Sequence, residues 1–92
     1  MKAKVRQLIS NSSGNPIANH FEIWTDKGYY FQSYQSIIFF QCNKTGKKYL
    51  DKYDWDYSTT TGKYRNQILG ENISETRKKI KEGKYKLKDL NK

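Results

Sequence analysis

Alternation of apolar and polar residues dominates the first half of the chain, and this period of two is typical of β-strands. Phe21 and Ile23 fall on one face, and Glu22 and Trp24 fall on the other. Residues 37–40 are apolar throughout, which is typical of a central strand covered on part of both faces. We expect an antiparallel meander with strands at 20–25, 29–34, 37–40 and 47–50 and turns at 25–28 and 43–46.

The N-terminal residues are harder to assign, because residues 3–9 fit either an edge strand or a short helix. Val5 and Ile9 lie four positions apart, as on a helix, but Ala3, Val5 and Ile9 also alternate with polar residues. We favour the strand, at the periphery of the fold. Residues 10–19 are rich in Ser, Asn and Gly and contain the only Pro, so we expect a flexible loop there.

The second half of the chain predicts two short helices. The first covers residues 59–69, with Ser58 or Asp56 as its N-cap and Gly70 at its end. The second follows Asn72, whose side chain is expected to form a capping box with Glu75. The stripe of the first helix that would face the sheet consists of Tyr57, Thr61, Tyr64 and Ile68.

The second helix would turn one side to the protein and its lysines to solvent, and Gly83 would stop it. Its inner positions are Ile73, Thr76, Arg77 and Ile80, and its outer positions are Lys78, Lys79 and Lys81. Tyr85, Leu87 and Leu90 then indicate a short closing strand or loop. The sequence therefore predicts an α+β fold in a single domain of residues 1–92: an antiparallel sheet of three to five strands followed by two short helices packed on one face.

The charge of the chain is strongly positive, at a formal net +9. Residues 58–92 carry ten Lys or Arg and only four Asp or Glu, so the basic surface should belong mainly to the second half. Such a balance favours a polyanionic partner. The simpler interpretation is that these lysines only form a solvated surface.

Several classes of function lack support in the sequence. A single Cys and a single His argue against a disulfide framework and against a zinc site built by this chain alone, and no other metal or cofactor pattern is present. His20 has no visible partner with which to activate a nucleophile, and Gly62-Lys63 lacks the P-loop spacing. No apolar run has the length of a membrane span or of a signal-peptide core. We expect a cytoplasmic, non-enzymatic protein without a cofactor and without a membrane partner.

Motifs from residue 31 to Gly83 resemble a family of small proteins from phages and plasmids of low-GC Gram-positive bacteria. They are FQSYQSII at 31–38, Tyr49-Leu50, WDYSxTTxxYRN at 55–66 and ETRKKI at 75–80. The family is a domain of unknown function. The resemblance implies a mobile-element origin, transfers no site residues, and leaves residues 1–19 outside.

Nucleic-acid binding is the first functional hypothesis. Hydroxyls and backbone N–H groups at a helix start can bind a phosphate, and two basic clusters lie nearby in sequence. The predicted contact residues are Thr59, Thr60, Lys63, Arg65, Arg77, Lys78, Lys79 and Lys81. Tyr30, Tyr34 or Tyr64 would stack on bases if the target is single-stranded. Alternatively, the threonine hydroxyls only satisfy the helix end.

The second hypothesis is a protein inhibitor or adaptor that acts on a host complex, such as a defence system. Trp24, Trp55 and the arginines are residue types that dominate protein interfaces, although Trp55 also fits the role of a core anchor. Homodimerisation through the open face or edge of the sheet is a further expectation.

Overall fold

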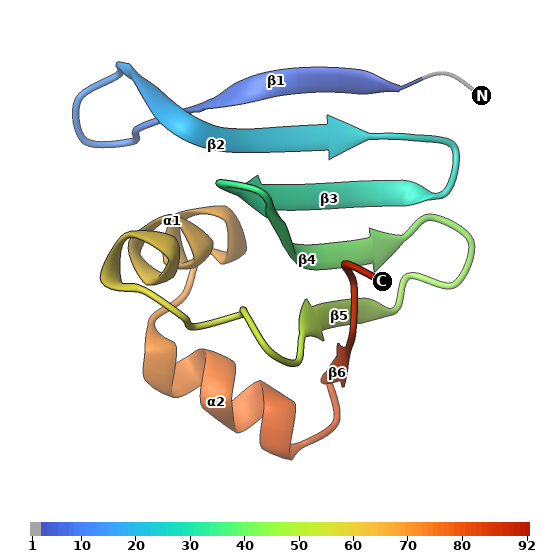
Figure 1. Ribbon diagram of the computed structural model, residues 1–92. Helices are drawn as coiled ribbons and strands as arrows, with labels where there is room; N and C mark the ends of the chain where they lie inside the picture. Colours follow the sequence, from blue (N-terminus) through green and yellow to red (C-terminus); the bar gives the residue numbers. More distant parts are fainter. Residues whose placement is uncertain (1–2) are drawn as a thin grey trace.

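A computed structural model describes residues 3–92 and shows a six-stranded sheet with two helices packed against it (Figure 1). The predicted domain began at residue 1, and Met1 and Lys2 lie outside the described residues. In chain order the elements are β1 (Lys4–Ile9), β2 (Pro16–Trp24), β3 (Gly28–Ser33), β4 (Ser36–Cys42), β5 (Lys48–Asp51), α1 (Thr59–Leu69), α2 (Ile73–Lys81) and β6 (Tyr85–Lys88).

The strands lie in the sheet in the order of the chain, from β1 to β6. Each of the first five pairs antiparallel with the next, and β6 pairs parallel with β5. The α+β class is confirmed, but the sheet has one strand more than the predicted maximum of five and is mixed. The extra strand is β6, and it lies parallel to β5 because the long connection through α1 and α2 returns the chain to the starting end of β5 (Figure 1). Parallel pairing requires such a crossover.

The N-terminal segment forms an edge strand, as favoured, but the expected loop is shorter than predicted. Strand β2 begins at Pro16, which pairs with Ile9, so residues 16–19 belong to the sheet. Pro16 is tolerated there because it is the first residue of its strand. A tight turn replaces the remaining loop, with the Ser10 N–H donating to the Asn15 carbonyl at 2.9 Å.

The core lies on one face of the sheet. A β-bulge in β4 pairs Phe31 with Phe39 but Gln32 with Ile37, which leaves Ile38 as the extra residue. Ile38 and Phe39 are therefore both buried, although they are adjacent. The buried apolar residues are Leu8, Phe31, Ile38, Phe39, Leu50 and Tyr85.

Both helices pack on this core through a few apolar side chains, among them Tyr64 and Ile68 of α1 and Ile80 of α2. Figure 1 shows α1 beside β3 and α2 beside β6. Of the two N-cap candidates for α1, Ser58 is the cap and Asp56 is not. The other predicted caps are confirmed, because Gly70 ends α1 with φ 67° and Asn72 forms the capping box of α2 with Glu75. Within residues 3–92 neither helix is long and apolar enough to cross a bilayer.

Candidate functional site

The predicted site begins at the N-terminus of α1. The Ser58 hydroxyl accepts a hydrogen bond of 3.1 Å from the Thr61 amide and so satisfies one of the free N–H groups of the first turn. Thr61 is buried, whereas Thr59 and Thr60 are exposed. The two exposed threonines thus present their hydroxyls at the positive end of an eleven-residue helix, where the dipole favours anions.

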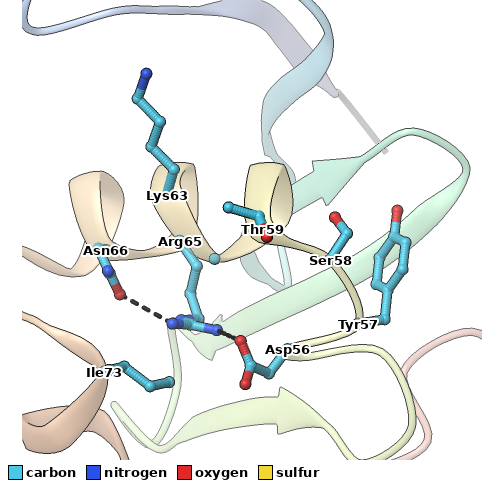
Figure 2. Close-up of a pocket in the computed structure, with 9 residues that line it drawn as sticks. Asp56, Tyr57, Ser58, Thr59, Lys63, Arg65, Asn66 and Ile73 are labelled. Atoms are coloured by element: carbon cyan, nitrogen blue, oxygen red, sulfur yellow. Dashed lines mark hydrogen bonds and ion pairs between the residues drawn. The ribbon is translucent and has the colours of Figure 1, made fainter.

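A surface hollow of about 740 Å³ lies beside this helix start. Figure 2 shows Arg65 and Asp56 together in the hollow, Ile73 of α2 at its border, and the Lys63 side chain pointing away from them. A carboxylate therefore stands next to the guanidinium. The hollow itself is a poor anion site, and the usable positive charge lies outside it.

Arg65 was predicted to contact phosphate, and the structure corrects this prediction, because only 1% of its side chain is exposed. Its guanidinium donates to the Trp55 carbonyl at 2.8 Å, to Asp56 Oδ1 at 2.9 Å and to Asn66 Oδ1 at 3.0 Å. It also lies 5.1 Å from the centroid of the Trp55 ring. The planar fork of arginine suits such a set of partners. Through these contacts Arg65 holds residues 55–56, which precede α1, against the helix.

The cations of α2 divide into free and engaged side chains. Lys78 and Lys81 are exposed, and no ion pair within residues 3–92 involves them. Arg77 was expected on the inner side of the helix but is 65% exposed, with Nη2 at 3.7 Å from Asp56 Oδ2. That contact is long and solvated, so it restrains Arg77 only weakly.

Lys79 was predicted to point outward as a free cation, and instead it pairs with Glu71 at 2.5 Å. Thr76 Oγ1 and Tyr85 OH also donate to this carboxylate, at 2.6 and 3.0 Å. Burial alone would raise the pKa of Glu71, but the hydrogen bonds, first of all from Lys79, lower it below its ordinary value. The same contact raises the pKa of Lys79. Lys79 is therefore part of the junction between α2 and β6.

The three tyrosines considered for base stacking do not form one platform. Tyr30 lies on β3, on the sheet face opposite the core, because it alternates with the buried Phe31. Tyr34 is 46% exposed in the β3–β4 turn, and Tyr64 of α1 is half-buried with its ring centroid 5.0 Å from that of His20. A single strand cannot use all three at once.

His20, which had no visible partner in the sequence, lies in a buried chain of hydrogen bonds. Its Nδ1 lies 2.8 Å from the Ala18 carbonyl oxygen and its Nε2 lies 3.0 Å from Ser33 Oγ. Ser33 is fully buried, so its hydroxyl is out of reach of a substrate. His20 and Ser33 meet only through the register of the β2–β3 hairpin. Within residues 3–92, no group of three His, Cys, Asp or Glu side chains is arranged to hold a metal ion.

Comparison with known proteins places the chain in a family. A family model described as "Family of unknown function (DUF8033)" matches residues 3–84. The resemblance to a domain of unknown function is confirmed, with the correction that the match includes residues 3–19. No curated protein and no solved structure matches the chain.

Proposed function

The chain belongs to DUF8033, a family of unknown function, and from its surface chemistry we propose that it is a small non-enzymatic protein that binds nucleic acid through backbone phosphates. Its motifs support the further proposal that a mobile genetic element encodes it. The observation that carries the proposal is an imbalance in how the fold uses its charges.

At least five of the nine acidic side chains are engaged in ion pairs, in a helix cap or in hydrogen bonds to the backbone. Asp51 is buried and accepts the backbone N–H groups of Asp54 and Leu90, both at 2.8 Å. Others pair with a cation or cap a helix, so little negative charge is left to balance the lysines. The acids engaged in these ways are Glu22, Asp51, Asp56, Glu71 and Glu75. The chain carries a formal net charge of +9, so its exposed cations outnumber the acids that remain free, and this excess attracts a polyanion.

The surface that we propose for the phosphates, the helix-side surface, consists of Thr59, Thr60, Lys63, Lys78 and Lys81. All five are exposed, and they come from the start of α1 and the second half of α2. Contacts to phosphate position a protein without reading bases. We therefore expect binding with little sequence preference on this side.

The test is fluorescence anisotropy with a labelled thymidine dodecamer and a labelled duplex, over a series of salt concentrations. We expect the logarithm of the affinity to fall linearly with the logarithm of the salt concentration, with a slope of about −0.7 per phosphate neutralised on a single strand and about −0.9 on a duplex. The variant Lys63→Gln/Lys78→Gln/Lys81→Gln should bind both ligands at least about tenfold more weakly and show a shallower slope. Lys79 is left unchanged because it holds Glu71.

A second triple variant matches this change in charge. Lys4→Gln/Lys52→Gln/Lys84→Gln removes three exposed lysines that lie outside the helix-side surface, and it should keep most of the affinity. Equal losses in both triple variants would contradict a defined surface. The proposed function is wrong if micromolar protein binds neither ligand at low salt. A stoichiometric host protein that copurifies after nuclease treatment would instead support the inhibitor or adaptor hypothesis.

A further inference from the structure

The face of the sheet opposite the core carries a continuous row of apolar side chains. The pairing registers place Ile23 opposite Tyr30, Tyr30 opposite Phe40, and Phe40 opposite Tyr49, so four adjacent strands each contribute one residue. Residues that pair directly across strands share a face. Val5 of β1 extends the row beyond Ile23 and is 59% exposed.

The three rings in this row, here called the aromatic ladder, are Tyr30, Phe40 and Tyr49. The centroids of Tyr30 and Phe40 are 4.6 Å apart with 31° between the ring planes, and those of Phe40 and Tyr49 are 5.9 Å apart with 21° between the planes. The rings are only half-buried, since the helices pack on the other face. Each ring therefore keeps part of its surface exposed on an open sheet.

Lysines surround the aromatic ladder on two sides. The β2–β3 and β4–β5 turns lie together at one end of the sheet, because the Asn43 N–H donates to the Lys27 carbonyl at 2.9 Å. On the edge strand β6, Lys86 pairs with Tyr49, and Lys88 Nζ lies 5.6 Å from the centroid of the Tyr49 ring. The exposed lysines of this border are Lys27, Lys44, Lys86 and Lys88, and Asp26 is the exposed acid among them.

We propose that this open face is a second binding surface, on which the bases of a single-stranded nucleic acid stack on the aromatic ladder while its phosphates reach the surrounding lysines. Rings supply stacking for any base, and cations beside them supply the backbone contacts. A second copy of the chain fits less well, because a twofold interface would bring two sets of four lysines together. The inference rests on the proposed function only in that the ligand is nucleic acid.

The first test measures the anisotropy of the labelled thymidine dodecamer and of the duplex with ring variants. Tyr30→Leu, Phe40→Leu and Tyr49→Leu keep an apolar side chain and remove the aromatic face. Each should weaken binding of the single strand by at least about fivefold, the lower end of the effect of one stacked base. Duplex binding should stay unchanged, because its bases are stacked already. The matched control is Tyr53→Leu, which alters a tyrosine that is 68% exposed outside the strands.

The second test uses the unaltered protein, so it does not depend on how the variants fold. Cys42 is the only cysteine, and on β4 it shares a face with Phe40, two positions earlier. Hydrogen bonds to Thr45 lower the pKa of its thiol, which increases the fraction of thiolate that can react with a disulfide reagent. A saturating thymidine dodecamer should slow this reaction severalfold, and the duplex should not.

The outcomes separate the two proposals. If the dodecamer binds but Cys42 reacts at an unchanged rate and the ring variants bind normally, the open-face inference is wrong and the helix-side surface remains. If neither nucleic acid binds, the proposed function itself has failed. If raising the protein concentration alone protects Cys42 and sedimentation shows a dimer, the face is an interface between copies, and the inference is overturned.

Discussion

Ser33 on β3 and Thr61 on α1 are joined by a hydrogen bond of 2.9 Å between two buried hydroxyls. The direction of the bond follows from its neighbours. The Ala18 carbonyl only accepts, so Nδ1 of His20 donates to it, and in the tautomer with its one proton on Nδ1 the Nε2 atom accepts from Ser33. Ser33 then accepts from Thr61, and Thr61 accepts from Ser58, the cap of α1. One chain of hydrogen bonds therefore holds the helix start on the sheet.

Replacing Thr61 by valine should break this chain at its centre without changing side-chain volume. The hydroxyls of Ser33 and Ser58 would each lose a partner, and an unsatisfied buried hydroxyl costs about 1–3 kcal/mol. Urea denaturation should show that loss in the free energy of unfolding, with an unchanged dependence of this free energy on urea concentration. Thr60→Val is the control, because Thr60 is exposed one position earlier in the same helix, and it should cost less than about 0.5 kcal/mol. Equal costs would show that the chain contributes nothing to stability.

Arg65→Lys keeps the positive charge and should nevertheless destabilise the protein. A lysine at this position cannot reproduce the three hydrogen bonds to Trp55, Asp56 and Asn66. Asp56 is 36% exposed and partly solvated, so we expect a loss of about 1–3 kcal/mol in urea denaturation. The folded variant should bind the thymidine dodecamer as tightly as the parent. Weaker binding at equal folded fraction would restore Arg65 as a contact residue.

Local signals in the sequence predicted the local structure well. Alternation located most of β2 and β3, an apolar run located β4, and the turn at 43–46 located β5. Residue type alone identified Gly70 and Asn72 as caps and left Ser58 and Asp56 as the two candidates for the N-cap of α1. These features depend on neighbours within a few positions, so a single sequence contains them. The position of β6 beside β5 depends on how a connection of two helices is directed in space, which no local pattern specifies.

The candidate site was predicted less well, because a sequence pattern does not show which cations form ion pairs inside the fold. Whether Arg65 and Lys79 face solvent depends on where the Asp56 and Glu71 carboxylates come to lie. The aromatic ladder was missed for a similar reason. Tyr30, Phe40 and Tyr49 become neighbours only through the strand register. The bulge at Ile38 also interrupts the alternation of faces along β4, so the face of Phe40 cannot be read from the sequence pattern.

Stability should depend on pH through Glu71. The pKa of Glu71 is lowered from 4.5, so its contribution is fully present above the pKa of the unfolded chain and is lost as the pH falls through the folded value. Glu71→Gln should be less stable at pH 7 by roughly 1–3 kcal/mol, and the difference from the parent should shrink below about pH 4. Glu82→Gln is the control, because Glu82 meets Lys84 only at the surface, at 3.5 Å. A constant difference between parent and Glu71→Gln across this range would contradict the assignment.

Gly62 offers a stabilising substitution near the start of α1. It lies within α1, and a Cβ there would meet Asp56 Oδ1 at 3.4 Å and Arg65 Nη2 at 3.6 Å, which are ordinary contact distances. Alanine is favoured over glycine in a helix interior by about 0.8–1.0 kcal/mol, so Gly62→Ala should raise the midpoint of thermal unfolding. Gly70→Ala should lower the midpoint, because Gly70 ends the helix with φ 67°, a conformation that costs alanine about 1–2 kcal/mol. If the midpoint rises with Gly62→Ala and falls with Gly70→Ala, the start of α1 is tightly packed but unstrained. A lower midpoint for Gly62→Ala would mean that the side chains around Arg65 leave no room for a methyl group.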